Sequence, residues 1–524
     1  MHRFTFQNLI RRSSDRFNRR RLIYDTLTKR SLSYGECLLL IQNTSQNFQS
    51  AGLTKGCMIV SYTPLSLEAV ILCWAVWRNG LVFVPIDHTW PASLLGQILN
   101  ETSPALIVTD AIRFPTAASL APPDKIHVLT ASDQPQAVLS HPGLNARGIQ
   151  PPTGPADPDP DDPAVILYTS GSTGTPKGVV LSQHALCNSG KRVSEHFNWQ
   201  SSDVFMNLGD LHSMSGLRNT CLAPLFSGSS MIIAQPEERN NVMHLFDLVF
   251  DLQIHYLGVA PTVVRQMNAV ASAERKDKLA SLRAVLCTGA PLAKDQLELF
   301  YRTYSKPVFN YYGLTETAGL CAGHNAETFS PTDNSIGKPV GAEFIIVPGA
   351  PHDRQDTGEL VVKSDNLMMG YFKKEKETAE VLKEGCFFTG DLVRKRSDGC
   401  FEWLGRKKNT VKNIYSDLIH LEEIDRALEA CPLIQEACAC SYTRLEEDER
   451  IVAFIVPKEY PVEKEAGMIK DVKRHMDNRV GKNRAPWFYY IEETLPRNSM
   501  GKVQRQQLTE KLHAYLRSGH TRYY

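Results

Sequence analysis

The stretch YTSGSTGTPKG, residues 168–178, holds the residues whose types and spacing best define a chemistry. Its glycines allow backbone N–H groups to approach an anion closely. Its serine and threonine hydroxyls add neutral hydrogen-bond donors, and Lys177 adds a mobile positive charge. The apolar run Val165–Leu167 comes directly before it and is typical of a buried strand. We therefore predict a loop that binds a polyphosphate at the end of a strand.

This loop differs from the P-loop of the common nucleoside triphosphatases. That motif has Gly-Lys followed by Ser or Thr at the start of a helix, whereas here Pro176 precedes Lys177 and Gly178 follows it. A flexible Gly/Ser linker is the alternative interpretation. Because a linker has no need of a buried strand on one side or of a Pro-Lys-Gly exit on the other, we favour the phosphate-binding loop.

The length and composition predict a globular protein with more than one domain. At 524 residues the chain exceeds what one hydrophobic core usually organises. Hydrophobic residues make up 42% of it and charged residues 22%, as in ordinary globular proteins. The 58 basic and 57 acidic residues nearly cancel, so neither a nucleic acid nor an anionic membrane is expected as a partner.

The cysteines and the apolar windows indicate a reducing, cytoplasmic setting. Twelve cysteines are scattered without the CxxC or Cys/His spacing of a zinc site. Cys438 and Cys440 are interpreted as part of an alternating strand rather than as a redox pair. The first residues lack the apolar stretch of a signal peptide, and the most apolar window, Ala69–Trp77, is too short to span a bilayer.

Strand-like and helix-like patterns alternate over the first 140 residues. This alternation predicts an α/β fold with largely parallel sheets. A second α/β block runs from the phosphate loop to about Asn310, with Val285–Cys287 as a short strand. The strands expected in the first block are Met58–Ser61, Val82–Ile86 and Ala105–Val108, and the helices are Leu38–Ala51, Leu65–Trp77 and Pro91–Asn100.

The rest of the chain changes character twice. From Gly358 to Trp403 short β-segments alternate with turns, which predicts a β-rich subdomain. A small α+β block follows the basic segment Arg406–Lys408. We therefore predict a large N-terminal domain over residues 1–405 and a small C-terminal domain over residues 406–524.

Four further motifs follow the phosphate loop. They are residues 310–317 (NYYGLTET), 359–371 (ELVVKSDNLMMGY), 389–392 (TGDL) with Gly405-Arg406, and 496–502 (PRNSMGK). In this order and at these distances, the five motifs together resemble the adenylate-forming superfamily, which includes acyl-CoA synthetases, the adenylation domains of peptide synthetases and firefly luciferase. The resemblance covers the chain from about Phe6 to Leu508.

The resemblance implies a reaction in two steps. A carboxylic acid attacks the α-phosphorus of ATP, pyrophosphate leaves, and an acyl-adenylate forms. A thiol, of CoA or of the phosphopantetheine on a carrier protein, then takes the acyl group and AMP departs. ATP and Mg²⁺ are the implied cofactors. Residues 1–405 would bind ATP and the acid, and residues 406–524 would form a mobile lid.

By the same resemblance, most contacts to ATP come from the first domain. Glu316 is expected to bind the Mg²⁺ ion, which prefers hard oxygen ligands, and Thr315 to donate to the α-phosphate. A helix cap is the alternative interpretation of this Thr-Glu pair. Tyr312 is expected to lie against adenine, with a core tyrosine as the alternative. The other expected ATP-binding residues are Thr169, Ser170, Gly171, Ser172, Thr173, Gly174 and Lys177 at the phosphates, and Gly289, Ala290 and Pro291 at adenine.

Three residues of the later motifs complete the implied nucleotide site. Asp391 fits an acceptor for the two ribose hydroxyls, although Thr-Gly-Asp alone is also an ordinary turn. Arg406 is expected to contact ribose or phosphate. Lys502 is the expected catalytic residue of the first step, because a charge on a flexible stem can stabilise the negative charge that develops there. A solvated lysine is the competing interpretation.

The thiol step meets a break in the pattern. Lys408 lies at the hinge position of the superfamily, and Lys412 aligns with a lysine that faces the active site after the small domain rotates. Relatives usually continue Lys-x-x-Gly, and the glycine lets the pantetheine arm pass. Here Tyr415 stands within the run 412–417 (KNIYSD), so an altered thiol step is an alternative.

The acid is expected to bind between residues 207–216 and the segment that begins at Thr288. Ser215 falls where peptide synthetases carry the aspartate that pairs with an α-amino group. An unpaired ammonium in a partly buried site is costly, so we expect an acid without a free α-amino group. His212 falls where acyl- and aryl-CoA synthetases often carry a histidine, which makes it a catalytic candidate or a structural residue. The predicted pocket residues are Asn207, His212, Ser215, Gly216, Thr288 and Gly313.

Other features keep the peptide-synthetase branch open. Residues 84–87 (VPID) and Pro91 are more typical of that branch, and Asp210 could pair with the more distant amine of a β-amino acid. We predict an ATP-dependent acid–thiol ligase that uses CoA or a carrier protein. The alternatives are an adenylation domain for a β-amino acid, an adenylating enzyme with an altered thiol step, and a non-catalytic binding relative, which would have no need of Lys502.

Overall fold

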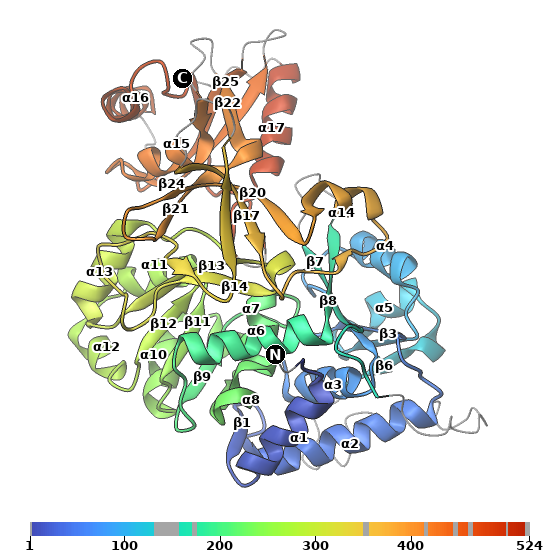
Figure 1. The fold of residues 1–524 in the computed structure, drawn as a ribbon. Helices are drawn as coiled ribbons and strands as arrows, with labels where there is room; N and C mark the ends of the chain where they lie inside the picture. The colour runs from blue at the N-terminus through green and yellow to red at the C-terminus, as the bar shows by residue number, and fades with distance from the viewer. Residues whose placement is uncertain are drawn as a thin grey trace. The chain divides into compact units, whose positions relative to one another are not determined.

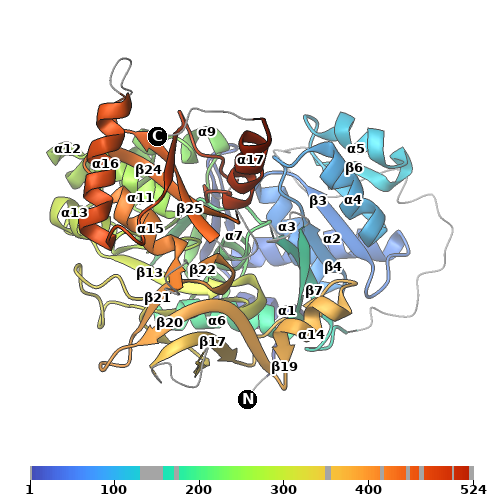
Figure 2. The same cartoon turned by 90° about the horizontal axis from the view of Figure 1, so that it is seen from above.

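The chain forms two compact units (Figure 1, Figure 2). Unit 1 consists of Met1–Glu343 and Lys363–Phe387, and unit 2 consists of Phe344–Val362 and Phe388–Tyr524. Unit 2 thus joins β-segments from the middle of the sequence to the C-terminal block, and the domain boundary near residue 405 stays a prediction. The computed structural model describes residues 3–129, 157–169, 176–348, 356–412, 418–443, 449–459, 465–498 and 501–518.

Unit 1 contains a nine-stranded sheet with a parallel centre. Six neighbouring strands, β13, β12, β11, β9, β10 and β1, pair in parallel. The strands at the two edges, β2 on one side and β14 and β15 on the other, pair antiparallel. Its central strands are short, apolar and buried, which suits a sheet covered on both faces. In spatial order the strands are β15 (Lys338–Pro339), β14 (Gly319–Gly323), β13 (Val308–Leu314), β12 (Ala284–Cys287), β11 (Tyr256–Val259), β9 (Val204–Asn207), β10 (Ser230–Ile233), β1 (Arg21–Asp25) and β2 (Arg30–Ser33).

A seven-stranded sheet is the second framework of unit 1. Five of its strands pair in parallel, while β7 and β8 form an antiparallel hairpin that β18 extends. The hairpin carries the phosphate-loop motif between its two strands. In spatial order the strands are β18 (Gly370–Tyr371), β8 (Lys177–Ser182), β7 (Pro163–Thr169), β4 (Val82–Pro85), β3 (Met58–Tyr62), β5 (Leu106–Thr109) and β6 (Ile126–Val128).

Helices pack against both sheets of unit 1, and one core cluster combines residues of α1, α2, α3, α6, α7 and α8 with residues of each sheet. Helices α10, α11 and α13 cover the nine-stranded sheet, and α4 and α5 cover the other one. The helices are α1 (Phe6–Phe17), α2 (Tyr34–Ser50), α3 (Leu67–Arg78), α4 (Ala92–Thr102), α5 (Phe114–Leu120), α6 (Gln183–His196), α7 (Met214–Cys221), α8 (Ala223–Ser227), α9 (Pro236–Arg239), α10 (Val242–Asp251), α11 (Pro261–Ala269), α12 (Ala273–Lys278), α13 (Lys294–Tyr304) and α14 (Glu375–Val381).

Helix α3 is the most deeply buried element of this layer. All of its residues except Arg78 are buried, and apart from Glu68 these buried residues are apolar. Trp74 Nε1 donates to the carbonyl of Cys221 at 2.8 Å, and Trp77 Nε1 donates to the carbonyl of Ala164 at 3.0 Å. These two bonds satisfy the indole N–H groups inside the core and tie α3 to α7 and β7.

The first part of unit 2 is built from long β-strands. β16 (Glu343–Val347), β17 (Thr357–Lys363) and β20 (Cys386–Lys395) lie in that order, and β21 (Phe401–Arg406) pairs with β20. The two-residue strand β19 (Leu382–Lys383), which belongs to unit 1, pairs with the first residues of β20. The β20–β21 register shifts between Leu392 and Val393. Such an irregularity turns side chains locally, and it comes directly after the predicted ribose-binding Asp391.

The C-terminal block of unit 2 is a small α+β fold. Helices α15 and α16 pack against one face of its three-stranded sheet, and α17 packs against the other face. Cys438 and Cys440 lie on β24 and share the α17 face, so the alternating strand expected there is confirmed. The elements are the hairpin β22 (Thr410–Lys412) and β23 (Leu418–His420), the sheet β24 (Ile434–Thr443), β25 (Glu449–Pro457) and β26 (Phe488–Ile491), and the helices α15 (Leu421–Glu429), α16 (Glu465–Val480) and α17 (Arg505–Ser518).

The predicted fold class is confirmed. The large α/β part, the β-rich segment and the small α+β block are all present. The helix expected at Leu65–Trp77 spans Leu67–Arg78, and the strand expected at Val82–Ile86 spans Val82–Pro85. Across the described ranges, every helix is too short or too polar to cross a bilayer.

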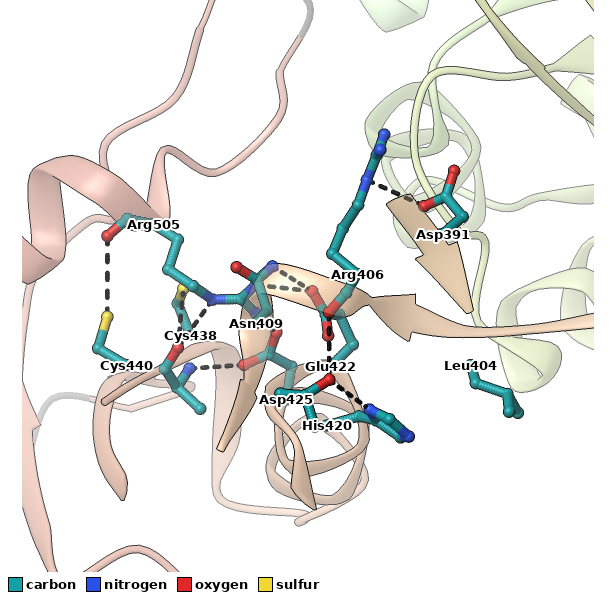
Figure 3. Close-up of polar contacts among 12 residues, drawn as sticks. Asp391, Leu404, Arg406, Asn409, His420, Glu422, Asp425, Cys438, Cys440 and Arg505 are labelled. Atoms are coloured by element: carbon teal, nitrogen blue, oxygen red, sulfur yellow. Dashed lines mark hydrogen bonds and ion pairs between the residues drawn. The ribbon is translucent and has the colours of Figure 1, made fainter. Parts of the chain in front are cut away.

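An ion-pair cluster anchors α17 to α15 in unit 2 (Figure 3). Arg505 Nη1 donates to Glu422 Oε1 at 2.8 Å, its Nη2 pairs with Asp425, and its Nε donates to the carbonyl of Ala439 at 2.8 Å. The three charged side chains are at most 19% exposed. Burial raises the pKa of Asp425 to about 6, although Arg505 opposes this shift. The arginine therefore balances two carboxylates that are largely shielded from water.

We expect Arg505→Met to destabilise unit 2 by about 3–5 kcal/mol, because removal of one partner leaves largely buried carboxylates unpaired. The loss should shrink between pH 8 and pH 5, since a protonated carboxyl needs no partner. Urea denaturation at both pH values, followed by circular dichroism, measures it. Arg394→Met is the control: its pair with Glu402 is largely exposed and should be worth less than about 1 kcal/mol. Equal effects of the two substitutions would contradict this account.

Candidate active site

The carboxyl ends of β9, β11, β12 and β13 lie next to one another at one edge of the nine-stranded sheet. Asn207 ends β9, Thr288 follows β12, and the 3-10 turn Thr315–Thr317 follows β13. Ligands of open parallel sheets bind at this kind of edge. The fold therefore brings residues predicted for the acid and residues predicted for ATP to the same edge.

The phosphate-loop motif joins β7 to β8. Thr169 and Lys177 are paired across the hairpin, and Thr169 Oγ1 donates to the Lys177 carbonyl at 3.4 Å. The predicted phosphate-binding residues Ser170, Gly171, Ser172, Thr173 and Gly174 lie outside the described residues, so their roles stay predictions.

Lys177 and Glu316 share a contact with Tyr371, a residue for which the sequence analysis predicts no role. Tyr371 lies on β18, beside β8, and its hydroxyl donates to Glu316 Oε1 at 2.9 Å. The ammonium of Lys177 lies 4.9 Å from the centre of the same ring. Tyr371 therefore holds the predicted phosphate lysine and the predicted metal-binding carboxylate in one constellation.

Glu316 has the chemistry that a magnesium site needs. Its side chain is half-buried, and one carboxylate oxygen is oriented by Tyr371. Its backbone is also fixed, because its carbonyl accepts from the amide of Met368 at 2.8 Å. An oriented carboxylate whose tyrosine partner also contacts a lysine fits a hard cation that accompanies phosphate groups. Thr315, the neighbouring candidate, is half-buried as well.

The predicted adenine residues come from adjacent strand ends. Gly289, Ala290 and Pro291 directly follow β12, and Tyr312 lies on the neighbouring strand β13. Thr288 Oγ1 joins the two segments by donating to the carbonyl of residue 311 at 3.1 Å. Tyr312 is half-buried, so it lacks the full burial of a core tyrosine.

In unit 2, Asp391 is held from two sides. Its carboxylate is 1% exposed, and Oδ1 accepts from Trp403 Nε1 and from Arg406 Nε, each at 2.9 Å. Figure 3 shows the contact with Arg406. Its backbone amide donates to Thr389 Oγ1 at 3.0 Å, and Arg406 Nη1 donates to the Thr389 carbonyl at 2.9 Å. The predicted ribose acceptor and its arginine thus form one rigid pair, in which Trp403 is a third member that the sequence did not identify.

Lys502 lies on a tight turn of unit 2. The Lys502 amide donates to Asn498 Oδ1 at 2.9 Å, and its carbonyl accepts from the Asn498 amide at 2.9 Å. Desolvation and, after it, the positive charges of Arg406, Lys408 and Arg505 together lower the pKa of Lys502 to about 8, whereas Asp391 opposes them. The residue is nevertheless exposed in surface area, so we ascribe the shift to crowding around the ammonium rather than to full burial.

The predicted hinge is anchored just beyond Lys408. Lys408 is exposed on the 3-10 turn Lys407–Asn409, and Asn409 Nδ2 donates to Glu422 Oε1 at 2.5 Å. The backbone of Lys412 ends β22, while its side chain and the run with Tyr415 lie outside the described residues. The roles of Lys408, Lys412 and Tyr415 in the thiol step stay predictions.

On the acid side, the loop between β9 and α7 forms a polar cluster with the segment after β4. His212 Nε2 lies 3.7 Å from Asp87 Oδ2, and His88 Nδ1 lies 3.8 Å from Asp210 Oδ2. Burial lowers the pKa of His88 first, although Asp210 opposes this shift. One donor atom each from Asp87, His88 and His212 lie within 4.8 Å of one another, a spacing that could hold a cation.

Asp210 already has a strong partner. Arg239 Nη2 donates to Asp210 Oδ1 at 2.5 Å, and the amide of Leu65 donates to the same oxygen at 3.0 Å. Burial alone would raise the pKa of Asp210, but Arg239 and the neighbouring His212 and His88 lower it overall. A substrate amine would have to compete with this arginine, which disfavours the β-amino acid alternative.

Ser215 and Gly216 lie in the first turn of α7. Ser213 caps this helix by accepting from the Gly216 amide at 3.1 Å. A Cβ at Gly216 would lie 2.0 Å from the Asp210 carbonyl oxygen, so glycine is needed for the loop to pass. Ser215 is half-buried, and Gly313 is half-buried on β13.

Comparison with known proteins adds independent evidence. The sequence profile of the AMP-binding enzyme family matches residues 10–372, and the profile of the AMP-binding enzyme C-terminal domain matches residues 423–502. The chain is 27% identical to the sulfoacetate–CoA ligase of Cupriavidus necator, over 91% of this chain and 92% of that protein. It is 28% identical to the L-proline–[L-prolyl-carrier protein] ligase of Pseudomonas fluorescens, over 92% and 94% of the two chains.

Solved structures share the fold. The ATP-bound crystal structure of MatB from Rhodopseudomonas palustris superimposes with a TM-score of 0.84 at 24% identity, over 96% of this chain and 98% of that one.

Tyr371→Phe should weaken ATP–Mg²⁺ binding about five-fold, because it removes one hydrogen bond to Glu316 but keeps the ring beneath Lys177. Tyr371→Leu should weaken it further, since the cation–π contact is also lost. Isothermal titration with a non-hydrolysable ATP analogue and magnesium measures both. Phe372→Leu, at the next position, serves as the control. Equal affinities of the wild type and Tyr371→Leu would refute the role of Tyr371.

The pKa of Lys502 predicts a basic limb in the pH profile of acid activation. Above about pH 8 the ammonium loses its proton and its charge, so kcat/KM for ATP should fall through that range. In Lys502→Arg the charge persists, because the guanidinium titrates far above pH 10. The fall in kcat/KM should therefore shift to a higher pH, even if the maximal rate drops. Lys482→Arg, an exposed control in unit 2, should keep the wild-type profile; a limb near pH 8 that survives in Lys502→Arg would exclude this lysine as its origin.

Proposed function

Because the chain belongs to the family of AMP-binding enzymes, we propose that it is an ATP-dependent acid–thiol ligase that forms AMP. The resemblance to the adenylate-forming superfamily is thereby confirmed. The observation that carries the proposal is the joint placement of Lys177, Tyr371 and Glu316 beside the strand ends of unit 1. It combines a phosphate-binding cation with an oriented carboxylate.

In the first step, a carboxylate oxygen of the acid forms a bond to the α-phosphorus of ATP. The bond from that phosphorus to pyrophosphate breaks, and the acyl-adenylate remains. Lys177 and the phosphate loop bind the β- and γ-phosphates, and Thr315 orients the α-phosphate. Bound at Glu316, Mg²⁺ supplies positive charge to the phosphates. Asp391 accepts the ribose hydroxyls, and Lys502 stabilises the negative charge that develops at the α-phosphate.

In the second step, a thiolate attacks the acyl carbon and AMP leaves with the electron pair of the broken anhydride bond. Curated relatives include both a CoA ligase and a carrier-protein ligase. Both kinds of acceptor present the same phosphopantetheine thiol, so either is compatible with this step. The break in the Lys-x-x-Gly pattern at Tyr415 supports a second candidate, adenylation with an altered thiol step.

The acid is proposed to lack an α-amino group. The pocket helix carries Ser215, a neutral residue, where an ammonium would need a carboxylate. The nearest acidic candidate on the same loop, Asp210, is bound by Arg239. The cluster of His212 with Asp87 orients the imidazole, and His212 is proposed to lie beside the carboxylate path.

Exchange of labelled pyrophosphate into ATP, screened over acyl, aryl and amino acids, tests the first step. Lys502→Ala should lower exchange by about 10²–10³-fold, the typical effect of losing one charge-stabilising donor. It should leave binding of ATP almost unchanged. Lys482→Ala is the matched control, and full exchange in Lys502→Ala would remove the catalytic assignment.

Addition of a thiol to the active reaction separates the two candidates. Accumulation of acyl-CoA would establish CoA as the acceptor, and turnover with a phosphopantetheinylated carrier alone would establish a carrier protein. Exchange without acyl transfer to either thiol would favour the altered second step.

A further inference from the structure

Arg218 on α7 is a buried cation without a matching anion. The residue is 0% exposed. Its Nε donates to Asn219 Oδ1 at 2.9 Å, and its Nη2 donates to the hydroxyl of Tyr311 at 2.8 Å. Nη1 is buried and makes no hydrogen bond, and within the described ranges no carboxylate is paired with Arg218.

Other buried arginines of unit 1 have the partner that Arg218 lacks. Arg239 pairs with Asp210, and Arg192 pairs with Asp365. Pairing of this kind offsets the desolvation of a charge inside a protein. The desolvation cost of the Arg218 charge is not offset by a carboxylate. An anion that contacted Nη1 would offset this cost and would therefore be bound strongly.

The backbone leaves room for this guanidinium. Gly319 begins β14 with a φ of +92°, and a Cβ there would lie 2.0 Å from Arg218 Nη1. Any other residue at position 319 would push the guanidinium away. On its other side, the guanidinium carbon lies 5.4 Å from the centre of the Tyr311 ring.

Arg218 adjoins the predicted acid-binding residues. It follows Ser215 by three positions on α7, which is about one helical turn along the same face. Its partner Tyr311 lies on β13, and the carbonyl of Tyr311 accepts from Thr288. Arg218 thus links α7 to β13, and both elements carry residues that are predicted to form the acid pocket.

Along α7, the charge is the reverse of what an amino acid needs. Ser215 offers no negative charge, and one turn further α7 presents a fixed positive charge. We propose that the acid activated by this enzyme carries a second anionic group, a carboxylate or a sulfonate, which Arg218 binds. This inference rests on the proposed function and adds the substrate class.

The recognition chemistry is a charge-assisted hydrogen bond from Nη1 to an oxygen of that group, in a site shielded from water. An acid with an apolar tail of the same length would leave the guanidinium desolvated and unpaired. Such a mismatch discriminates strongly between two substrates. The enzyme should therefore favour acids with two anionic groups over their apolar counterparts.

Pyrophosphate exchange with matched acids tests the proposal. The probes are the dicarboxylic acids of three to six carbons, the monocarboxylic acids of the same lengths, and 3-sulfopropanoate. In the wild type, kcat/KM for the best acid with two anionic groups should exceed that of its monocarboxylic counterpart by at least 100-fold. In Arg218→Met, kcat/KM for the acid with two anionic groups should fall at least 100-fold, while kcat/KM for the monocarboxylic acid should change less than three-fold. The sulfonate arm decides which anion is preferred.

A wild-type preference for monocarboxylic acids would overturn the proposal, and so would an equal loss for both classes in a folded Arg218→Met. Circular dichroism checks whether Arg218→Met is folded. If it is unfolded, the substrate preference of the wild type and of Tyr311→Phe tests the proposal instead. Tyr311→Phe should reduce the preference several-fold, and an unchanged preference would count against the site. If no acid supports exchange, the proposed function fails. Calorimetric titration of the same acids then decides separately whether Arg218 binds the anion.

Discussion

The site depends on one constraint: parallel strands place all of their carboxyl ends at the same edge of a sheet. In unit 1 this edge gathers Asn207, Thr288 and Glu316 from β9, β12 and β13, although these residues are far apart along the chain. Strands buried on both faces have to be apolar, so polar residues are confined to the positions where the strands end. The polar side chains that could bind substrates therefore gather at the carboxyl ends of the strands.

Much of the framework follows from local patterns in the sequence. The alternation of short apolar runs with helical periods predicts the α/β class, and Leu67–Arg78 and Val82–Pro85 lie within a few residues of their expected positions. The glycines and hydroxyls around Lys177 predict a phosphate loop from local pattern, whereas the roles of Thr315 and Glu316 come from the family resemblance, and all three roles stay predictions. Local patterns therefore predict the class of fold correctly, while the residues of the nucleotide site stay predictions.

Partners that meet only in the folded chain could not be found in this way. Tyr371 reaches Glu316 across 55 positions, and Arg239 reaches Asp210 across 29. From the sequence, Asp210 could pair with a substrate amine, but in the fold this loop residue is bound by Arg239 of α9. Similarly, the lowered pKa of Lys502 depends on desolvation and on the cations that the fold of unit 2 places around it. Such pairings are set by tertiary packing, and no local pattern encodes them.

The hydrogen bond between Trp403 and Asp391 places a fluorescent side chain beside the proposed ribose acceptor. The indole N–H donates to the same carboxylate oxygen that Arg406 binds, so any sugar hydroxyl that occupies this oxygen must compete with the indole. Indole emission responds to the loss of a nearby negative charge and of a hydrogen bond. Among the six tryptophans of the chain, Trp403 is therefore the one whose emission should change when a ribose binds at Asp391 as proposed.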